Sequence, residues 1–483
     1  MFYFCKKSLR GLEKVSGYTY NVYDSLFSRW VTDKLLSCLK DVKKVGFLGF
    51  GKSNRAIYRR ICDGDFEFTI RSETGVDNAP KGARLCFGDG CFAPPYDDVL
   101  FLSPSARRDK EGILKSAASG TRLSSDAELF FALCDAPLLA VSGSDGKSTT
   151  VRMAEAILTR SGLNALACGN VGLPFIEGLY GKYDCLVTEI SSFTLEYMAP
   201  RVRRALITNI TENHLDWHGS FAAYIKAKEN LIEGAREVVL SPDTEACIPL
   251  IERHHPWGIF SLGHGYAELR RAYPFAECIF TSENGVLSIN GDGIIEISRL
   301  SLKEPHNVMN ALSAIALTHG LFNTGCGVEA LCDFSGLRHR METVSISDGV
   351  RYVDSSIDST PGRTAATLLS MPSETHVILG GRGKGLSYAP LIAPLKLKSG
   401  CIIISGENRE EISRTLSSDR SFDGRIITAD TLAEAVRLAK CRARRGDTVL
   451  LSPASTSYDA FSDFEERGDK FKEYVKNTTE GLK

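Results

Sequence analysis

The chain has 483 residues, of which 43% are hydrophobic and 24% are charged, and its formal net charge is −1 at pH 7. This composition is typical of a globular protein. Because the charge is balanced, the chain has neither the basic excess that indicates nucleic-acid binding nor the acidic excess of a solvating tail. At about 100–200 residues per domain, the length predicts about three domains.

The cysteines and the apolar runs indicate a cytoplasmic protein. None of the 14 cysteines forms a Cys-x-x-Cys pair, so we interpret them as reduced core residues, which favours the cytosol. The apolar run at the N-terminus is too short for a signal peptide. No stretch reaches about 18 consecutive apolar residues, so we expect no transmembrane helix.

The first predicted domain covers residues 1–135, including an N-terminal extension. Apolar residues recur at helical spacing within 26–39, which predicts a helix packed on this domain, with partner binding as the alternative. Strands alternating with a helix then predict a parallel, doubly wound sheet. These elements are a strand running into a glycine turn at 45–51, a helix at 56–62, and strands at 66–70 and 98–102.

Two further α/β domains are predicted, over residues 136–334 and 335–483. The second domain begins with a strand that feeds another glycine loop, and the third begins after Phe334. In the second we expect strands at 137–143, 184–188 and 204–208, helices at 148–161 and 307–318, and more β character over 235–297. In the third we expect strands at 352–353, 375–379, 401–404 and 448–451.

The strongest local motif is a glycine-rich loop between a predicted strand and a predicted helix. It consists of Gly143, Ser144, Asp145, Gly146, Lys147, Ser148, Thr149 and Thr150. Small residues let backbone N–H groups approach phosphate oxygens, and the helix N-terminus favours negative charge. Lys147 can reach the β- and γ-phosphates, and the Ser148 hydroxyl can bind Mg²⁺. Val141 replaces the first glycine of the general phosphate-loop pattern, but the context still predicts a phosphate site.

Two further residues belong near this loop, and a lysine follows them in sequence. Glu189 ends a buried strand, where an acid facing a phosphate loop can be a second Mg²⁺ ligand. His214 follows the end of another parallel strand, so it belongs to the same ligand-binding edge. Lys228 comes later, in a Tyr-x-x-x-Lys pattern.

Together these segments resemble the Mur ligase family, from about residue 45 to the C-terminus. Residues 143–149 match its phosphate loop with Ser144 for Thr, Glu189 matches its strand-end acid, and Asn213 replaces the Asp before its histidine. The resemblance implies ATP, two Mg²⁺ sites and a carbamylated Lys228, whose carbamate would be an oxygen ligand for a hard cation. It implies catalytic roles for Lys147, His214 and Lys228, and metal binding by Ser148, Glu189, His214 and Lys228.

The resemblance extends through the remaining segments. Asn307 and Asn310 would border the nucleotide base, and Arg340 would reach the ATP phosphates. Lys384 and the Ser-Pro-Ala-Ser-Thr-Ser segment ending at Ser457 resemble the D-glutamate-adding members, in which Ser457 and Phe464 would help bind D-glutamate. The Asp-Asn-Pro-Arg element of the diaminopimelate- or lysine-adding relatives is missing from the sequence.

Two segments depart from known patterns. The loop of Gly49, Gly51, Lys52 and Ser53 resembles the family's uridine-diphosphate loop, with Arg71 as a further contact, but Asn54 replaces the third glycine of a dinucleotide fingerprint. Near the third domain's start, matching Ser-x-x-Ser places Ser355 on the family's Asp and Ser359 on its D-glutamate-binding Ser or Thr. Either Asp354 or Ser355 therefore fills the ATP-proximal position.

The sequence thus predicts a monomeric ligase that couples ATP hydrolysis to addition of D-glutamate to UDP-N-acetylmuramoyl-L-alanine through an acyl phosphate. The alternatives are another amino-acid-adding Mur ligase, a folylpolyglutamate-type ligase, or a catalytically silent nucleotide-binding homologue. A dinucleotide-dependent oxidoreductase is less consistent, because Asn54 interrupts the glycine fingerprint.

Overall fold

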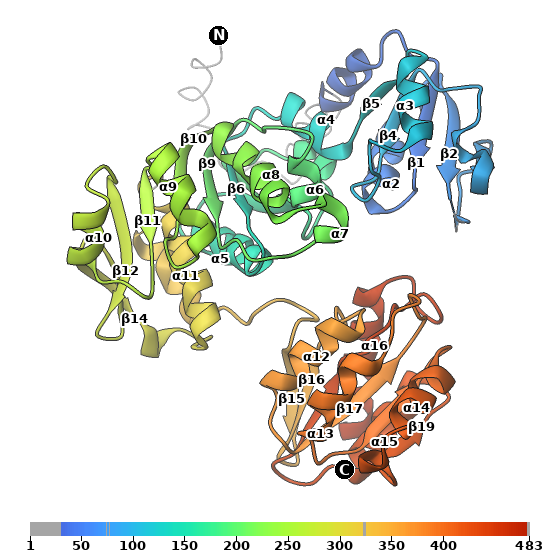
Figure 1. Cartoon of the computed structure of the whole chain (residues 1–483), viewed down its shortest axis with the longest axis vertical. Coiled ribbons are helices and arrows are strands. Elements are labelled where there is room, and N and C mark those ends of the chain that lie inside the picture. Colours follow the sequence, from blue (N-terminus) through green and yellow to red (C-terminus); the bar gives the residue numbers. More distant parts are fainter. Residues whose placement is uncertain (1–29, 74, 77, 322–324, 481–483) are drawn as a thin grey trace, which may run out of the picture. The chain divides into compact units, whose positions relative to one another are not determined.

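The computed structural model describes residues 30–480 except 74, 77 and 322–324. The chain divides into two compact units, Met1–Phe334 and Ser335–Lys483. The first unit contains a five-stranded and a nine-stranded sheet, and the second contains a six-stranded sheet (Figure 1). The predicted α/β class with three parallel-rich sheets is confirmed.

The first sheet has the order β3-β2-β1-β4-β5, and all its neighbouring strands are parallel. Its central strand is buried from Val45 to Leu48, and Phe47 stacks on Phe68 and Phe101. The order reverses at β1, so the glycine loop after β1 lies at a switch point, where ligands bind in such sheets. The elements are β1 (Lys44–Leu48), α2 (Lys52–Ile61), β2 (Glu67–Ser72), β3 (Arg84–Phe87), η1 (Gly88–Phe92), β4 (Val99–Leu102), α3 (Glu111–Ala118), β5 (Arg122–Ser124) and α4 (Asp126–Leu133).

The second sheet has the order β14-β13-β12-β11-β10-β9-β6-β8-β7, with only β13 and β14 antiparallel to their neighbours. Strand β6 pairs with both β8 and β9, so the loops after these three strands emerge at one edge. The strands are β6 (Leu138–Ser142), β7 (Ala165–Gly169), β8 (Cys185–Glu189), β9 (Val202–Ile207), β10 (Ala235–Leu240), β11 (Gly258–Phe260), β12 (Cys278–Glu283), β13 (Val286–Ile289) and β14 (Asp292–Glu296). The helices are α5 (Lys147–Arg160), η2 (Phe175–Tyr180), α6 (Ser192–Leu195), α7 (Leu215–His218), α8 (Phe221–Glu233), η3 (Glu245–Cys247), α9 (Ile248–His254), α10 (Tyr266–Ala272), η4 (Ile297–Arg299), α11 (Pro305–Thr318) and η5 (Gly325–Cys332).

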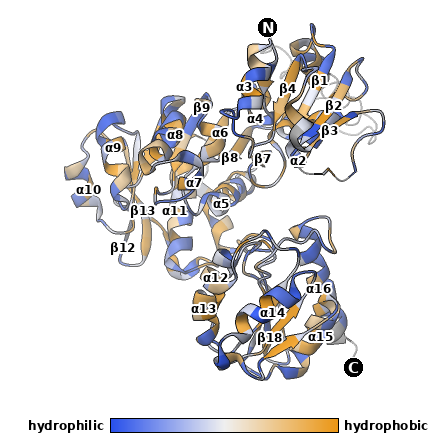
Figure 2. Cartoon of the chain, turned by 45° about the vertical axis from the view of Figure 1, so that its right-hand side comes forward, coloured by the Kyte–Doolittle hydropathy of each residue, from blue (hydrophilic) through white to orange (hydrophobic). Residues whose placement is uncertain are grey.

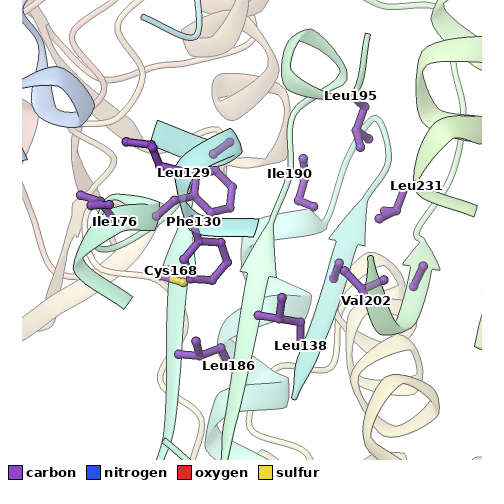
Figure 3. Close-up of a cluster of buried hydrophobic side chains, with 14 of the residues drawn as sticks. Leu129, Phe130, Leu138, Cys168, Ile176, Leu186, Ile190, Leu195, Val202 and Leu231 are labelled. Atoms are coloured by element: carbon purple, nitrogen blue, oxygen red, sulfur yellow. The ribbon is translucent and has the colours of Figure 1, made fainter. Parts of the chain in front are cut away.

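Both faces of this sheet are covered, which explains its continuous apolar strands. On one face, Leu139 and Val141 of β6 belong to a core cluster with residues of α5 and α11. On the other, Phe130 of α4 lies against Cys168 and Ile176 (Figure 3). Helix α4 therefore packs on the second sheet.

The third sheet has the order β15-β16-β20-β17-β18-β19, with only β15 antiparallel. The inner strand β18 is hydrophobic, whereas α16 is largely hydrophilic (Figure 2), as expected for a sheet between amphipathic helices. The strands are β15 (Glu342–Ser347), β16 (Val350–Asp354), β17 (Thr375–Gly380), β18 (Ile402–Ser405), β19 (Ile426–Thr428) and β20 (Thr448–Leu451). The helices are α12 (Pro361–Ser370), η6 (Ala389–Leu391), α13 (Ile392–Lys396), α14 (Arg409–Ser417), η7 (Arg420–Phe422), α15 (Leu432–Arg442) and α16 (Phe464–Glu480).

The predicted buried strands and the helices of the first two domains are confirmed within a few residues at their ends. The helix predicted over 26–39 is helical at 30–38, while residues 26–29 lie outside the described part. Five strands were not predicted: β3, β5, β7, β15 and β19. All five lie at sheet edges. Among the described residues, no helix is long and apolar enough to span a membrane.

Candidate active site

The glycine loop after β6 is built around two positions that only glycine fits. Gly143 has φ +143°, and a Cβ there would lie 1.9 Å from the Thr208 hydroxyl oxygen. Gly146 has φ +79°, and a Cβ there would lie 2.2 Å from Asn310 Oδ1. These are left-handed conformations with backbone in close contact. The loop therefore approaches its neighbours closely, and its Gly146 is the N-cap of α5, the end of a helix that favours an anion.

The segment after β9 holds this loop in place. The amides of Ser144 and Asp145 donate to the backbone oxygen and the side-chain oxygen of Asn209, each over 2.9 Å. The Thr208 hydroxyl donates to the Asp145 carbonyl over 2.6 Å. Sequence reasoning missed both supporting residues, although their position after a parallel strand at the same edge was a usable signal.

Two predicted metal ligands meet at the first turn of α5. The buried Ser148 hydroxyl donates to Glu189 Oε2 over 2.6 Å. Asn170 Nδ2 donates to Glu189 Oε1 over 3.0 Å, and this residue was also missed. The side chain of Lys147 donates to the Ser144 carbonyl over 2.8 Å. Two hard oxygen donors therefore lie together beside the glycine loop.

Lys228 lies inside the same cluster, with 1% of its surface exposed. Its ammonium group donates to the Gly143 carbonyl over 2.7 Å and lies 4.4 Å from the centre of the Tyr224 ring. The Tyr224 hydroxyl is 3.0 Å from Ser144 Oγ. Burial, and secondly the charge of Lys147, holds the pKa of Lys228 well below its ordinary value. Burial therefore makes the charged form of Lys228 less favourable than it is in water.

His214 is exposed at the start of α7, in the left-handed conformation at φ 53°. Its ring centre lies 4.8 Å from that of Phe193, which also contacts the rings of Trp217 and His218. His218 Nε2 is 3.0 Å from the Ser192 hydroxyl oxygen. The structure thus places His214 on an aromatic cluster that follows β9, with its imidazole at the surface.

The two asparagines of α11 differ in their surroundings. Asn310 is buried against the glycine loop, with its Oδ1 3.5 Å from the Thr150 hydroxyl oxygen. Asn307 is half-buried one turn earlier and donates to Glu304 over 3.0 Å. Asn310 therefore braces the loop itself, and Asn307 is nearer the surface.

The glycine loop of the first sheet is closed by Asn54. Gly49 has φ +72°, and Gly51 precedes the first turn of α2, which carries exposed Lys52 and half-buried Ser53. The Asn54 side-chain amide donates to the carbonyls of Leu48, Gly49 and Phe101. The residue that interrupts the dinucleotide fingerprint therefore ties the ends of β1 and β4 together.

Arg71, the predicted further contact of the uridine-diphosphate loop, accepts the Gly49 amide at its carbonyl over 2.8 Å, while its side chain is held inside the first unit. Its buried guanidinium forms an ion pair with Asp97, with Nε 2.7 Å from Oδ2. The other nitrogens donate to the carbonyls of Cys91, Ala93 and Pro95. Because all three nitrogens of the guanidinium donate hydrogen bonds, Arg71 holds the segment between β3 and β4 in place.

In the second unit, Asp354, one of the two candidates for the ATP-proximal position, is fully buried. Its Oδ2 lies 2.7 Å from His339 Nδ1, and its Oδ1 accepts from the Ser356 amide over 2.9 Å. Ser355 is equally buried and accepts a bond from the Met341 amide. Both candidates for the ATP-proximal position are therefore buried, and the half-buried Arg340 lies between their partners His339 and Met341 in sequence.

The residues expected to bind an amino acid lie on three segments of the second unit. Lys384 is exposed, and its Nζ lies 3.5 Å from the Ser359 hydroxyl oxygen. Ser457 is buried, and its carbonyl accepts the amides of Ala460 and Phe461. Phe464 begins α16, with its ring 6.2 Å from that of His339. Of these four, the structure joins Ser359 and Lys384 directly.

A parallel sheet that presents a glycine-rich phosphate loop beside a buried strand-end acid defines a nucleotide-binding α/β protein. Two family models match this chain: the Mur ligase middle domain over residues 141–318, and the Mur ligase glutamate ligase domain over residues 339–455. The chain belongs to the Mur ligase family.

Two curated relatives match most of the chain. UDP-N-acetylmuramoylalanine--D-glutamate ligase of Ruminiclostridium cellulolyticum is 32% identical, covering 92% of this chain and 100% of the relative. The enzyme of the same name from Clostridium perfringens is 31% identical, covering 90% of this chain and 97% of the relative.

Solved structures share the fold at lower identity. UDP-N-acetylmuramate-alanine ligase of Thermotoga maritima has a TM-score of 0.56 and 18% identity, covering 90% of this chain and 99% of that chain. Folylpolyglutamate synthase of Mycobacterium tuberculosis has a TM-score of 0.51 and 14% identity, covering 70% of this chain and 91% of that chain. At these identities the likeness concerns the fold alone.

Proposed function

We propose that this chain is an ATP-dependent ligase that adds D-glutamate to UDP-N-acetylmuramoyl-L-alanine during peptidoglycan precursor synthesis. The observation that carries the proposal is the 32% identity spanning the full length of a relative with that name. The phosphate loop and its surrounding cluster support an ATP-using reaction. We further propose a cytoplasmic monomer with three domains, over residues 1–135, 136–334 and 335–483.

ATP would bind at the loop of Gly143 to Thr149, where backbone amides and Lys147 face the β- and γ-phosphates. The Ser148 and Glu189 oxygens, 2.6 Å apart, are hard donors that fit Mg²⁺. Bound there, Mg²⁺ would neutralise charge on the transferring phosphoryl group. His214 and carbamylated Lys228 would complete two metal sites.

The environment of Lys228 supports carbamylation. Its burial lowers its pKa, which makes the neutral amine, the form that attacks carbon dioxide, more accessible than in an exposed lysine. The product is a carbamate, a carboxylate-like group that can bind a cation. Carbamylation would therefore give the side chain a negative charge in place of a positive one. Lys147 would then have an anionic partner in place of a like charge.

The remaining groups would bind the two other substrates. The loop of Gly49, Gly51, Lys52 and Ser53 would bind the uridine diphosphate, with the amides of α2 directed at the phosphates. Asn307, Asn310 and Arg340 would contribute to ATP binding. In the second unit, Ser359, Lys384, Ser457 and Phe464 would bind D-glutamate, with Lys384 pairing with a carboxylate.

In the proposed reaction, an oxygen of the alanine carboxylate attacks the γ-phosphorus of ATP, the bond to the β-phosphate oxygen breaks, and the products are an acyl phosphate and ADP. Lys147 and the amides of the glycine loop stabilise the charge that develops on the transferring oxygens. The D-glutamate amine then attacks the acyl carbon, and phosphate leaves. Lys384 and Ser359 orient the amino acid for this step.

The test is ADP release with Mg²⁺, ATP and UDP-N-acetylmuramoyl-L-alanine, supplying D-glutamate, L-glutamate, L-lysine or diaminopimelate in turn. We expect release that requires D-glutamate. Release with another amino acid would support a different member of the family. If no amino acid supports release while ATP still binds, the proposed ligase activity is wrong.

A further inference from the structure

Arg467 of α16 is a buried cation, with 3% of its surface exposed. Burial lowers its pKa to about 10. A guanidinium is costly to bury unless its donors are satisfied, and each of its hydrogen bonds is therefore informative. These bonds go to two segments that carry residues proposed to bind D-glutamate.

The first segment is the turn after β16. Arg467 Nε donates to the Ser356 hydroxyl oxygen over 3.0 Å, and Nη2 donates to the Ser356 carbonyl over 2.9 Å. The Ser356 hydroxyl in turn donates to the Phe464 carbonyl over 2.8 Å. Ser359 lies three residues further along this turn, so Arg467 fixes the chain that leads to it.

Two further segments meet at the opposite side of the guanidinium: the second ends at Ser457, and the third is the loop after β17. Nη1 donates to the Ser455 carbonyl over 3.0 Å, two residues before Ser457. A Cβ at Gly381 would lie 3.1 Å from Nη1. Gly381 begins the loop that leads to Lys384, and Arg382 of this loop pairs with Thr456 of the segment that ends at Ser457.

We propose that Arg467 is the positioning residue that sets the spacing of Ser359, Lys384 and Ser457, and thereby the affinity for D-glutamate. The inference rests on the proposed function. The planar guanidinium donates hydrogen bonds to the turn after β16 and to the segment before Ser457, and it packs against the loop before Lys384. A lysine keeps the charge but has no planar fork, so it cannot hold both hydrogen-bonded segments at the same spacing.

The test compares Arg467→Lys with Arg409→Lys, a conservative change of an exposed arginine on α14. We expect the KM for D-glutamate to rise about tenfold or more in Arg467→Lys, with the KM values for ATP and the UDP substrate unchanged. Arg409→Lys should match the parent. A second variant, Ser356→Ala, removes one acceptor of the same guanidinium and should raise the same KM more modestly, even if Arg467→Lys folds poorly.

An unchanged KM for D-glutamate in folded Arg467→Lys and in Ser356→Ala would overturn the inference. Equal increases in all three KM values would also overturn it, because they would indicate a general loss of structure. If the parent chain releases no ADP in response to D-glutamate, the proposed function itself is wrong. That outcome is recognised before any variant is measured.

Discussion

The hydroxyl of Ser148 and the carboxylate of Glu189 lie 2.6 Å apart, although they come from different strand-to-helix connections of the second sheet. Strands β6 and β8 are parallel neighbours, so the first turn of α5 and the end of β8 meet at one edge. This pair is the most direct structural support for a cation beside the phosphate loop.

Glu189→Gln should therefore weaken both catalysis and the response to magnesium. Replacing a carboxylate oxygen with an amide removes a hard anionic donor, and we expect kcat/KM to fall by about 100-fold or more. Steady-state rates over a magnesium titration measure the effect. The matched control is Glu268→Gln, an exposed acid on α10. A wild-type magnesium response in Glu189→Gln would remove this residue from the proposed metal site.

Lys228→Ala should abolish most activity, and a short carboxylic acid such as acetate should restore part of it. The reason is that a carbamate is a carboxylate-like group, which a small acid can replace in the space left by the side chain. Lys226→Ala, an exposed lysine on the same helix, is the control and should remain active. Addition of ¹³C-labelled bicarbonate should give a carbamate NMR signal in the parent that Lys228→Ala lacks. An identical signal in both proteins would contradict carbamylation of Lys228.

Asp126 should make the stability of the first unit depend on pH. Its carboxyl accepts the amides of Phe175 and Ile176 over 2.9 and 2.8 Å and a bond from Ser53, and burial raises its pKa to about 7. Because the folded-state pKa is above the ordinary value of 3.8, the stabilisation is complete below about pH 4 and is lost as pH rises towards 7, by roughly 4 kcal/mol at most.

Asp126→Asn removes this titration. Its melting temperature relative to the parent should therefore rise between pH 5 and pH 8, as the parent loses stability. Asp135→Asn, an exposed acid shortly after α4, should show no such trend. A difference between Asp126→Asn and the parent that is constant with pH would show that the carboxyl does not titrate in this range.

Arg71→Met should destabilise the first unit without a specific effect on substrate affinity. Removing one partner of a buried ion pair leaves Asp97 uncompensated, at a cost of about 3–5 kcal/mol. Denaturant unfolding measures the loss, with the exposed Arg84→Met on β3 as the control. A variant with parental stability and a raised KM for the UDP substrate would instead support the predicted role of Arg71 as a substrate contact.

The sequence by itself determined the α/β class and the positions of the central strands. These strands are buried on both faces and therefore appear as continuous apolar runs. The five unpredicted strands lie at sheet edges, where fewer apolar residues are needed and the local pattern is weak. The phosphate loop was also readable, because its glycines, lysine and serine are consecutive in the chain.

Only the tertiary structure decided which distant residues hold the segments of the site in place and which are bonded elsewhere. Asn209, Asn170 and Arg467 act through hydrogen bonds to segments far away in sequence, which no local pattern reports. Arg71 follows its strand as a substrate contact would, yet Asp97 and three carbonyls hold it inside the domain. The physical reason is that a side chain's role depends on the donors and acceptors that the fold brings around it, whereas the sequence specifies only its chemical type and its place in the chain.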